Sequence, residues 1–333
     1  MTAQPSANDQ PPIRITTPNE LVSLIPYLIG HHPADSLVLL GCDATKVIVT
    51  VRLGLGDPTN AWAQIVPNLA RSGVITGHLV GYGSAARVGP HIDTAHAALT
   101  LNDIASSAPV RVEHGRIYAT GTGAGPGDLA SSHADEGVRV DPHTAAAARA
   151  VVEGMVALPS RDAIHTLVAP TGPAEQAAMR SAVARARSAG APVTGEAAVQ
   201  AADAAVTDAL GSYRTGDRLT DDDVARLTLL LTDEQARDAV LARDEDDDAS
   251  IALWTDVTRR ADASLVAEPA CILFVAAWLA RRAPLAWAAL DRARDAEPGH
   301  RLTRLLSAMV WNGISPDQLA EVLRRRRSDA SHP

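Results

Sequence analysis

The sequence is poor in aromatic residues and lysine. Aromatic residues make up 3% of the 333 residues, and Phe274 is the only phenylalanine. Lys46 is the only lysine, so nearly all positive charge is arginine. Hydrophobic residues still make up 46% of the chain, which is enough for a packed interior and argues against a disordered protein. Alanine, valine and leucine must fill that interior, and this predicts closely packed helices.

The sequence also has few cysteines and shows no pattern of a signal peptide or a membrane-spanning helix. Cys42 and Cys271 are the only cysteines and belong to no paired motif, which excludes a disulfide framework or a cysteine-based zinc site. Residues 1–12 are polar and proline-rich, without the hydrophobic stretch of a signal peptide. The longest hydrophobic run, 270–280, is too short to span a bilayer. We therefore expect a soluble, cytoplasmic protein.

The net charge excludes a further class of partners. It is −9 at pH 7, with a pI near 5.6. An acidic protein of this kind is repelled by the phosphates of nucleic acids and by anionic membranes. We therefore expect neither nucleic acid nor a membrane as a partner.

The first third of the chain alternates predicted strands and helices. Thr17, Pro18 and Glu20 form a capping box with proline at the first helical position, so a helix should begin there and end at Gly30. Periodic and alternating runs predict the other elements. The expected strands are 13–16, 36–41, 46–53, 77–82, 109–113 and 116–119, and the further helices are 57–71 and 89–106. Between the last two strands, His114-Gly115 predicts a two-residue turn that needs positive φ. This order predicts an α/β (α+β) domain over residues 13–120, with a mixed sheet flanked by helices.

The rest of the chain has the pattern of helices. Prolines at first-turn positions mark the last ones, at 269–281, 284–296, 300–312 and 316–327. Several of them resemble TPR-like helical hairpins, although no fixed period runs through this half. The sequence predicts an all-α domain over residues 143–327, preceded by a linker loop at 121–142. Residues 1–12 and 328–333 are expected to be disordered.

The loop at residues 30–36, Gly-His-His-Pro-Ala-Asp-Ser, gathers polar groups between a helix and a strand. Histidine and aspartate suit acid–base chemistry, and serine can act as a nucleophile. Adjacent histidines in an extended segment point to opposite sides, so we expect no metal site. The candidate ligand-binding residues are His31, His32, Asp35, Ser36 and, from the strand at 46–53, Arg52.

A structural interpretation of this loop competes with the functional one. Ligand sites of open α/β sheets lie beyond the carboxyl ends of strands, whereas this loop precedes a strand. Asp35 and Ser36 would then bond backbone groups left free at the helix end and at Pro26, while Pro33 fixes the turn. This interpretation makes the loop a structural latch, and the functional one makes it part of a pocket.

No other stretch has a catalytic or cofactor signature. The glycine-rich residues 121–127 lack the Gly-Lys-Ser/Thr ending of a phosphate loop and are interpreted as a linker. The acidic runs at 221–223 and 244–248 lack the spacing of a calcium loop. The arginines at 324–327 are interpreted as a solvated helix end. We expect no cofactor.

Two stretches carry a resemblance to a known family. The first is 26–41, which contains His-His-Pro-Ala-Asp-Ser, and the second joins Trp-Leu at 278–279 to Ala-Leu-Asp-Arg-Ala at 289–293. The chain resembles the actinobacterial domain of unknown function 4192 family. Members carry an acidic residue soon after the strand arginine, where this chain has Gly54. The resemblance supports the fold and an actinobacterial host but implies no activity.

These observations leave two alternative functions. The absence of a catalytic signature and the repeat-like helices favour a soluble, non-catalytic interaction or regulatory protein, with a protein partner bound by the helical domain. The alternative is a small-molecule-binding protein or an enzyme with a pocket near residues 31–36.

Overall fold

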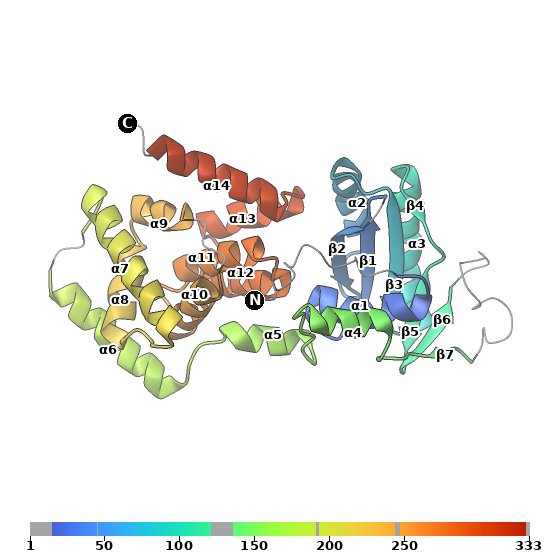
Figure 1. The fold of residues 1–333 in the computed structure, drawn as a ribbon, viewed down its shortest axis with the longest axis horizontal. Coiled ribbons are helices and arrows are strands. Elements are labelled where there is room, and N and C mark those ends of the chain that lie inside the picture. Colours follow the sequence, from blue (N-terminus) through green and yellow to red (C-terminus); the bar gives the residue numbers. More distant parts are fainter. Residues whose placement is uncertain (1–14, 45, 121–135, 191–192, 244–246, 331–333) are drawn as a thin grey trace, which may run out of the picture. The chain divides into compact units, whose positions relative to one another are not determined.

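The chain folds as two compact units, Met1–Arg161 and Asp162–Pro333 (Figure 1). A computed structural model describes residues 15–44, 46–120, 136–190, 193–243 and 247–330. The first unit contains a mixed sheet with helices on both faces, and the second unit is helical. The predicted fold class, a mixed α/β part followed by a helical part, is confirmed.

The sheet has seven strands within the described residues, in the order β2-β1-β3-β5-β6-β7, with β4 paired to β3. β1 lies between β2 and β3 and is antiparallel to both, whereas β3 is parallel to β5. The sheet is therefore mixed, and β2 and β7 stand at the two ends of this strand order. The strands are β1 (Ser36–Cys42), β2 (Val47–Gly54), β3 (Thr76–Tyr82), β4 (Ala105–Ser106), β5 (Val110–Glu113), β6 (Arg116–Ala119) and β7 (Val138–Arg139).

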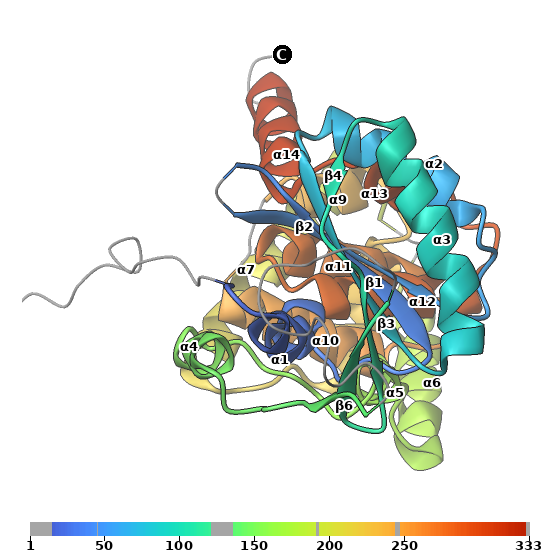
Figure 2. The ribbon, with the colours of Figure 1, turned by 90° about the vertical axis from the view of Figure 1, so that its right-hand side faces the viewer.

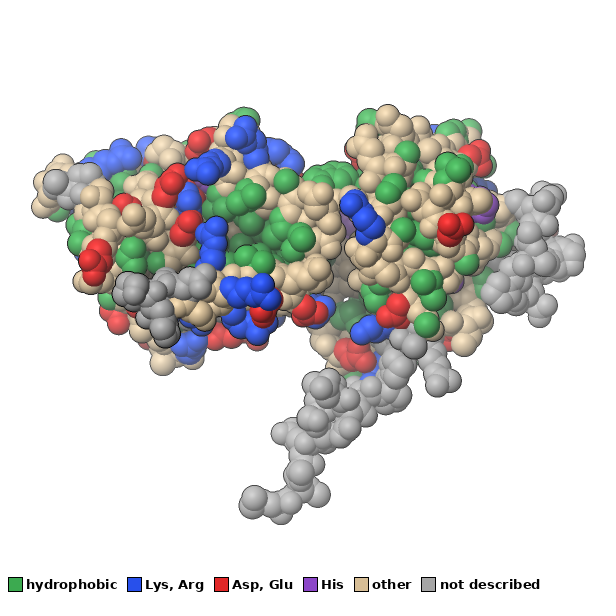
Figure 3. All heavy atoms as spheres, turned by 90° about the horizontal axis from the view of Figure 1, so that it is seen from above, with side chains coloured by type: hydrophobic (Ala, Val, Ile, Leu, Met, Phe, Trp, Pro, Cys, Tyr) green, Lys and Arg blue, Asp and Glu red, His purple; other side chains and the backbone are tan. Residues whose placement is uncertain are grey.

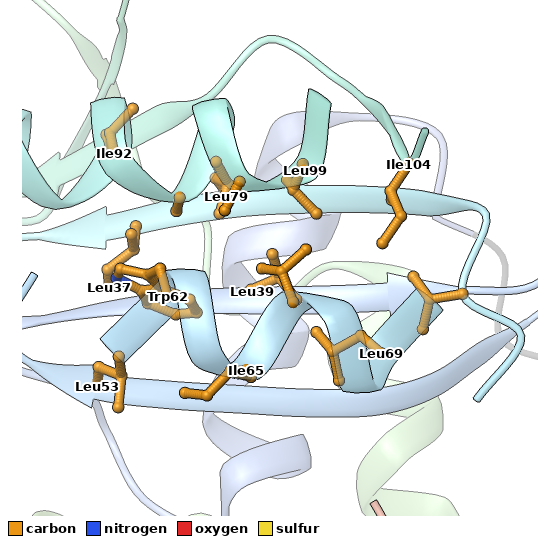
Figure 4. Packing of buried hydrophobic residues seen from close by; sticks show 14 of the residues in the cluster. Leu37, Leu39, Leu53, Trp62, Ile65, Leu69, Leu79, Ile92, Leu99 and Ile104 are labelled. Carbon is orange, nitrogen blue, oxygen red and sulfur yellow. The ribbon is translucent and has the colours of Figure 1, made fainter. Parts of the chain in front are cut away.

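Helices cover both faces of the sheet (Figure 2). Side chains alternate along a strand, so Leu37 and Leu39 face α2 (Ala61–Arg71) and α3 (Ala85–Leu101). Val38 and Leu40 face α1 (Pro18–Ile29) on the other side. Leucine, isoleucine and valine fill the core under α2 and α3, together with the fully buried Trp62 (Figure 4). β1 is buried on both faces, as its continuous hydrophobic run predicts.

Two predictions from local sequence are confirmed. At the start of α1, Glu20 N donates to Thr17 Oγ1 and Thr17 N donates to Glu20 Oε2, each at 3.2 Å, which completes the capping box. The helix ends at Gly30, which has a φ of 75°. His114 and Gly115 have φ values of 47° and 71°, as the two-residue turn between β5 and β6 requires.

Other predicted boundaries are wrong. The helix expected at 57–71 begins at Ala61, because the carboxylate of Asp57 instead accepts a hydrogen bond from Gly54 N at 2.7 Å and shapes a turn. The helix expected at 89–106 covers Ala85–Leu101, and Ala105 and Ser106 form β4. Of the strand expected at 13–16, residues 15–16 are not in a strand and the rest lies outside the described residues.

The first unit extends beyond the predicted domain boundary. β7 falls within the predicted linker 121–142, of which 121–135 lie outside the described residues, and it pairs with β6. α4 (Ala145–Val152) then packs against α1 through Leu24, Ala146 and Ala150. The hydroxyls of Ser23 and Thr144 lie 2.5 Å apart at the same contact. α4 therefore belongs to the sheet-containing unit, not to the helical part that was expected from residue 143.

The second unit is built from helices α5 to α14. α11 packs against α12, and partly buried contacts join α10 to its neighbours: a hydrogen bond from Tyr213 of α7 and an ion pair with Asp221 of α8. α14 continues to Ala330, so the tail expected to be disordered from 328 is helical at its start, and 331–333 lie outside the described residues. None of the described helices has the length and hydrophobicity needed to cross a membrane. The helices are α5 (Arg161–Val168), α6 (Pro173–Ser188), α7 (Glu196–Thr215), α8 (Asp221–Leu230), α9 (Glu234–Leu241), α10 (Asp248–Arg260), α11 (Ala267–Leu279), α12 (Ala283–Ala296), α13 (Arg301–Trp311) and α14 (Pro316–Ala330).

Candidate ligand-binding site

The loop at 30–36 lies at the amino end of β1, and the sheet topology decides what surrounds it. Because β1 is antiparallel to its neighbours, its first residue, Ser36, pairs with the last residues of β2 and β3, Gly54 and Tyr82. β5 runs parallel to β3, so its carboxyl end lies at the same edge. Strand ends of this kind are the usual place for ligand sites. The loop precedes β1, as the sequence predicts, but it lies beside the carboxyl ends of β2 and β3, so its place before a strand does not count against a ligand site.

Three side chains at this edge share the face of the sheet that α1 covers. Ser36 is directly opposite Tyr82, and Arg52 is directly opposite Val38, which packs under α1. Opposed residues of antiparallel strands point to the same face, as do residues two apart in one strand. His31 comes directly after the end of α1 and is buried. We call His31, Ser36, Arg52 and Tyr82 the polar cluster.

Each member of the polar cluster has a buried polar atom without a hydrogen-bond partner. The atoms are His31 Nδ1, Ser36 Oγ, Arg52 Nε and Tyr82 Oη. His31, Ser36 and Tyr82 are 4%, 0% and 7% exposed, so these side chains are shielded from bulk solvent. Ten such atoms occur among the described residues, and four of them gather in this cluster. An unpaired buried polar group costs roughly 1–3 kcal/mol, so the arrangement is unfavourable in the free protein.

The charges of two arginines, Arg52 and Arg161, act within the polar cluster. Burial lowers the pKa of His31, and the charges of Arg52 and Arg161 lower it further, so the imidazole is neutral at pH 7. Burial also lowers the pKa of Arg52, the charge of Arg161 adds to this, and Asp57 opposes it. Burial raises the pKa of the Tyr82 hydroxyl, which keeps its proton. The site therefore presents hydrogen-bond donors in a cationic setting.

Two of the five predicted residues lie apart from the polar cluster. Asp35 has a left-handed conformation with a φ of 42°, and its carboxylate pairs with Arg87 of α3 at 2.5 Å. His32 is exposed, whereas His31 is buried, so the predicted divergence of the two histidines is confirmed. The structure thus brings together His31, Ser36 and Arg52.

The hydrogen bonds expected of a structural latch are not those that form. Ser36 Oγ has no partner, and the carboxylate of Asp35 bonds the side chain of Arg87. The end of α1 is closed by backbone groups instead. Leu158 N donates to Gly30 O at 2.8 Å, and Leu158 O accepts from His32 N at 2.9 Å.

Sequence reasoning did not include Tyr82 and Arg161 in the site. The pattern of residues 77–82 predicts a strand, but only the strand order places Tyr82 opposite Ser36. Arg161 is distant from His31 in the sequence. Its charge acts on His31 because Leu158, three residues before it, pairs with the loop at 30–32. No local signal in the sequence reveals either relationship.

A second buried polar group lies in the helical unit. Cys271 Sγ is 3.8 Å from His300 Nδ1, and His300 Nε2 is 3.1 Å from Glu268 Oε1. The order thiol, imidazole, carboxylate is that of a cysteine nucleophile with its base and orienting acid. Cys271 is fully buried, however, and His300 caps α13, so these residues connect α11 to α13. Among the described residues no group of three or more His, Cys, Asp or Glu side chains is arranged to hold a metal ion.

A pocket of about 660 Å³ lies beside α3, on the face of the sheet away from α1. Its lining is mostly small and hydrophobic, with Asp93, His96 and Arg111 among the charged or titratable groups. The guanidinium of Arg111 is already occupied, because it pairs with Glu113, donates to Gly83 O at 3.3 Å and stacks on Tyr118. The pocket therefore offers space but no concentration of unpaired donors.

The sheet, its helical layers and the polar cluster define the chain as an α/β protein with a helical second unit and a buried donor-rich site. The model of the family described as "Domain of unknown function (DUF4192)" matches residues 18–317, and the chain belongs to this family. The matched region includes the whole polar cluster and confirms the resemblance drawn from the sequence. Comparisons with curated proteins and with solved structures found no match.

Proposed function

We propose that the protein is a non-catalytic regulatory protein whose α/β unit binds a small molecule at the polar cluster. The observation that carries the proposal is the gathering of four buried, unpartnered polar atoms, three of them on one face of the sheet and the fourth from the loop after α1. Each costs free energy in the empty site, and a ligand that pairs with them recovers that cost on binding. Their position at the strand ends supports the same function.

The geometry favours binding over catalysis. A serine nucleophile needs a base within hydrogen-bond reach, and neither Ser36 Oγ nor His31 Nδ1 has a hydrogen-bond partner. The carboxylate that could orient such a base, Asp35, is paired with Arg87. The polar cluster therefore supplies donors for recognition without an activated nucleophile.

A ligand screen by thermal shift tests the proposal, since a molecule that binds only the folded state raises the unfolding temperature. The library should contain anionic, neutral and cationic metabolites. We expect at least one class to stabilise the wild type and to lose its effect in Ser36→Ala and Tyr82→Phe. Tyr118→Phe is the matched control, because Tyr118 lies on the same sheet and faces away from α1. Equal shifts in Tyr82→Phe and Tyr118→Phe would contradict the site.

Each stabilising compound should also be incubated with the protein and followed by NMR. An unchanged spectrum is expected of a binding protein. Conversion of the compound, absent in Ser36→Ala, would show that the polar cluster is catalytic.

A second candidate function is protein binding by the helical unit. Hydrophobic side chains gather on its face near α14 (Figure 3), and the large exposed ones on α13 and α14 are Leu305, Trp311 and Val322. Leu305 is 63% exposed in a protein whose other leucines are mostly buried. A partner captured by the wild type should be lost with Leu305→Asp and kept with Leu101→Asp, which changes an exposed leucine of the first unit. Equal capture by both variants would exclude this surface.

A further inference from the structure

The unpartnered atoms of the polar cluster include groups that can donate hydrogen bonds to a ligand. The nitrogen Nε of Arg52 can only donate a hydrogen bond, since a guanidinium has no acceptor. The hydroxyls of Ser36 and Tyr82 are on the same face of the sheet, and both can donate because no acceptor holds their protons. A single ligand that pairs with all of these donors must present several acceptor atoms.

We propose that the ligand of the polar cluster is a small molecule bearing an oxyanion, a carboxylate or a phosphate, bound by Arg52, Ser36 and Tyr82. This inference rests on the proposed function and adds the chemical class of the ligand. Carboxylate and phosphate oxygens match the planar fork of arginine and are the acceptors that it binds most strongly. The side chain of Arg52 already donates one bond, from Nη2 to Ala34 O at 3.2 Å, which leaves Nε for the ligand.

The charges around the site support an anion. Arg52 and Arg161 lie close enough to oppose each other's charge, and both act on His31. Of the acids nearby, Asp35 pairs with Arg87, and Asp57, whose carboxylate accepts from Gly54 N at 2.7 Å, offsets only part of the effect of burial and of Arg161 on Arg52. At the end of α1, the carbonyl of Gly30 is paired with Leu158 N. An oxyanion would relieve the repulsion between the guanidinium groups, which a neutral or cationic ligand cannot do.

The test is a titration of the full-length protein with inorganic phosphate, pyrophosphate, acetate and succinate at constant ionic strength, with sodium chloride as the reference. The midpoint of thermal unfolding or the chemical shifts of the histidine rings report binding. We expect one series, phosphates or carboxylates, to bind, and the series that binds identifies the source of the oxyanion. Shifts no larger than those with sodium chloride, which leave water as the only occupant, would overturn the inference.

Variants of arginine decide whether the anion occupies this site. Arg52→Met should weaken binding by about tenfold or more, since it removes both the charge and the donor. Arg52→Lys keeps the positive charge but lacks Nε, so its affinity for the anion should lie between those of the wild type and Arg52→Met. It replaces Arg52→Met in the test if that variant does not fold. Arg87→Met removes an exposed arginine of the same unit that is held by Asp35, and it should bind as the wild type does. An equal loss in Arg52→Met and Arg87→Met would overturn the inference.

The outcome separates this inference from the proposed function. A neutral or cationic compound that needs Ser36 and Tyr82 but not Arg52 would leave the binding function standing and exclude an oxyanion. Failure of every compound, including the oxyanions, to depend on Tyr82 would exclude both.

Discussion

Ser36 and Tyr82 lie directly opposite each other in the antiparallel pairing of β1 with β3, and both hydroxyls are buried without a hydrogen-bond partner. The two side chains share one face of the sheet, yet neither hydroxyl satisfies the other. Natural cores normally pair such groups. The pair therefore lowers the stability of the free protein at the place where we propose that a ligand binds.

Replacing Tyr82 by phenylalanine should stabilise the free protein. The substitution keeps the ring in the core and removes a buried hydroxyl that has no partner, so the free energy of unfolding should rise by about 1 kcal/mol. Urea unfolding measures this change. Tyr118→Phe should leave the stability unchanged. A clear loss of stability in Tyr82→Phe would show that its hydroxyl is paired.

The stability of the protein should fall as the pH rises above 6.5. Hydrogen bonds to Cys271 and Glu268 raise the pKa of His300 to about 10. A group whose pKa is higher in the folded state than in the unfolded state stabilises the folded protein. This contribution is complete below the unfolded pKa and is lost as the pH rises from the unfolded pKa to the folded one. The loss should be on the order of 1.4 kcal/mol for each unit of the shift, between pH 6.5 and 10.

His300→Asn is the control for this pH dependence. Nδ1 of His300 makes two contacts with Thr303. It accepts a bond from Thr303 N at 3.4 Å, which requires Nδ1 to be unprotonated and the ring therefore neutral. Its contact with Thr303 Oγ1, at 2.8 Å, can form with either the neutral or the charged ring. The longer bond is the weaker, so the raised pKa should prevail. Asparagine keeps a helix-capping acceptor without titrating. The free energy of unfolding of this variant should no longer fall between pH 6.5 and 10. An unchanged fall would assign the pH dependence to another group.

Asp256 should be important for the stability of the helical unit. Its carboxylate accepts hydrogen bonds from Tyr213 at 2.5 Å, from Arg260 at 2.9 Å and from Arg218. Asp256→Asn removes one of the two carboxylates that pair with the largely buried Arg260, while Asp221 remains, and it should cost about 1.5–3 kcal/mol.

Asp222→Asn is the matched control for Asp256→Asn. Asp222 pairs with Arg185 on the surface, where both side chains are more than half exposed. An exposed pair contributes little, so the loss should stay below about 0.5 kcal/mol. Equal losses in guanidinium unfolding would exclude a special role for Asp256.

Gly81→Ala should destabilise the sheet-containing unit. A Cβ at Gly81 would overlap Cγ1 of Val88, so α3 could not keep its approach to β3. Overpacking of this kind costs about 1–3 kcal/mol. Gly89→Ala, one residue after Val88, meets no atom within 4 Å and should be neutral or stabilising. Val88→Ala in the Gly81→Ala background should restore stability, and its failure to do so would exclude the overlap as the cause.

Features specified by neighbouring residues could be predicted from the sequence. The capping box of Thr17 and Glu20 and the turn at His114 and Gly115 depend on a few adjacent residues, and both formed as expected. β4 and β7 contain two residues each, too few for a periodic signal, and were missed. α3 begins four residues before the predicted position, because Gly89 and Pro90 resemble a helix start but lie inside the helix.

The candidate site could be predicted only in part, because its geometry depends on strand order. The composition of the loop at 30–36 indicates polar chemistry, but not that Ser36 faces α1 while Asp35 turns to Arg87. The insertion of β1 between β2 and β3 brings Tyr82 to the loop, and pairing with Leu158 brings Arg161. These relationships join residues that are distant in sequence.

The return of the chain to α1 has a consequence for the order of events during synthesis. The contact of Ser23 with Thr144 and the pairing of Gly30 and His32 with Leu158 each span more than a hundred residues of chain. Contacts of such long range form late, because the ends of a large loop must first meet. A ribosome must therefore release nearly half of the protein before His31 can take its final place. The strands can pair earlier, so the nascent sheet would exist for a time without a completed polar cluster.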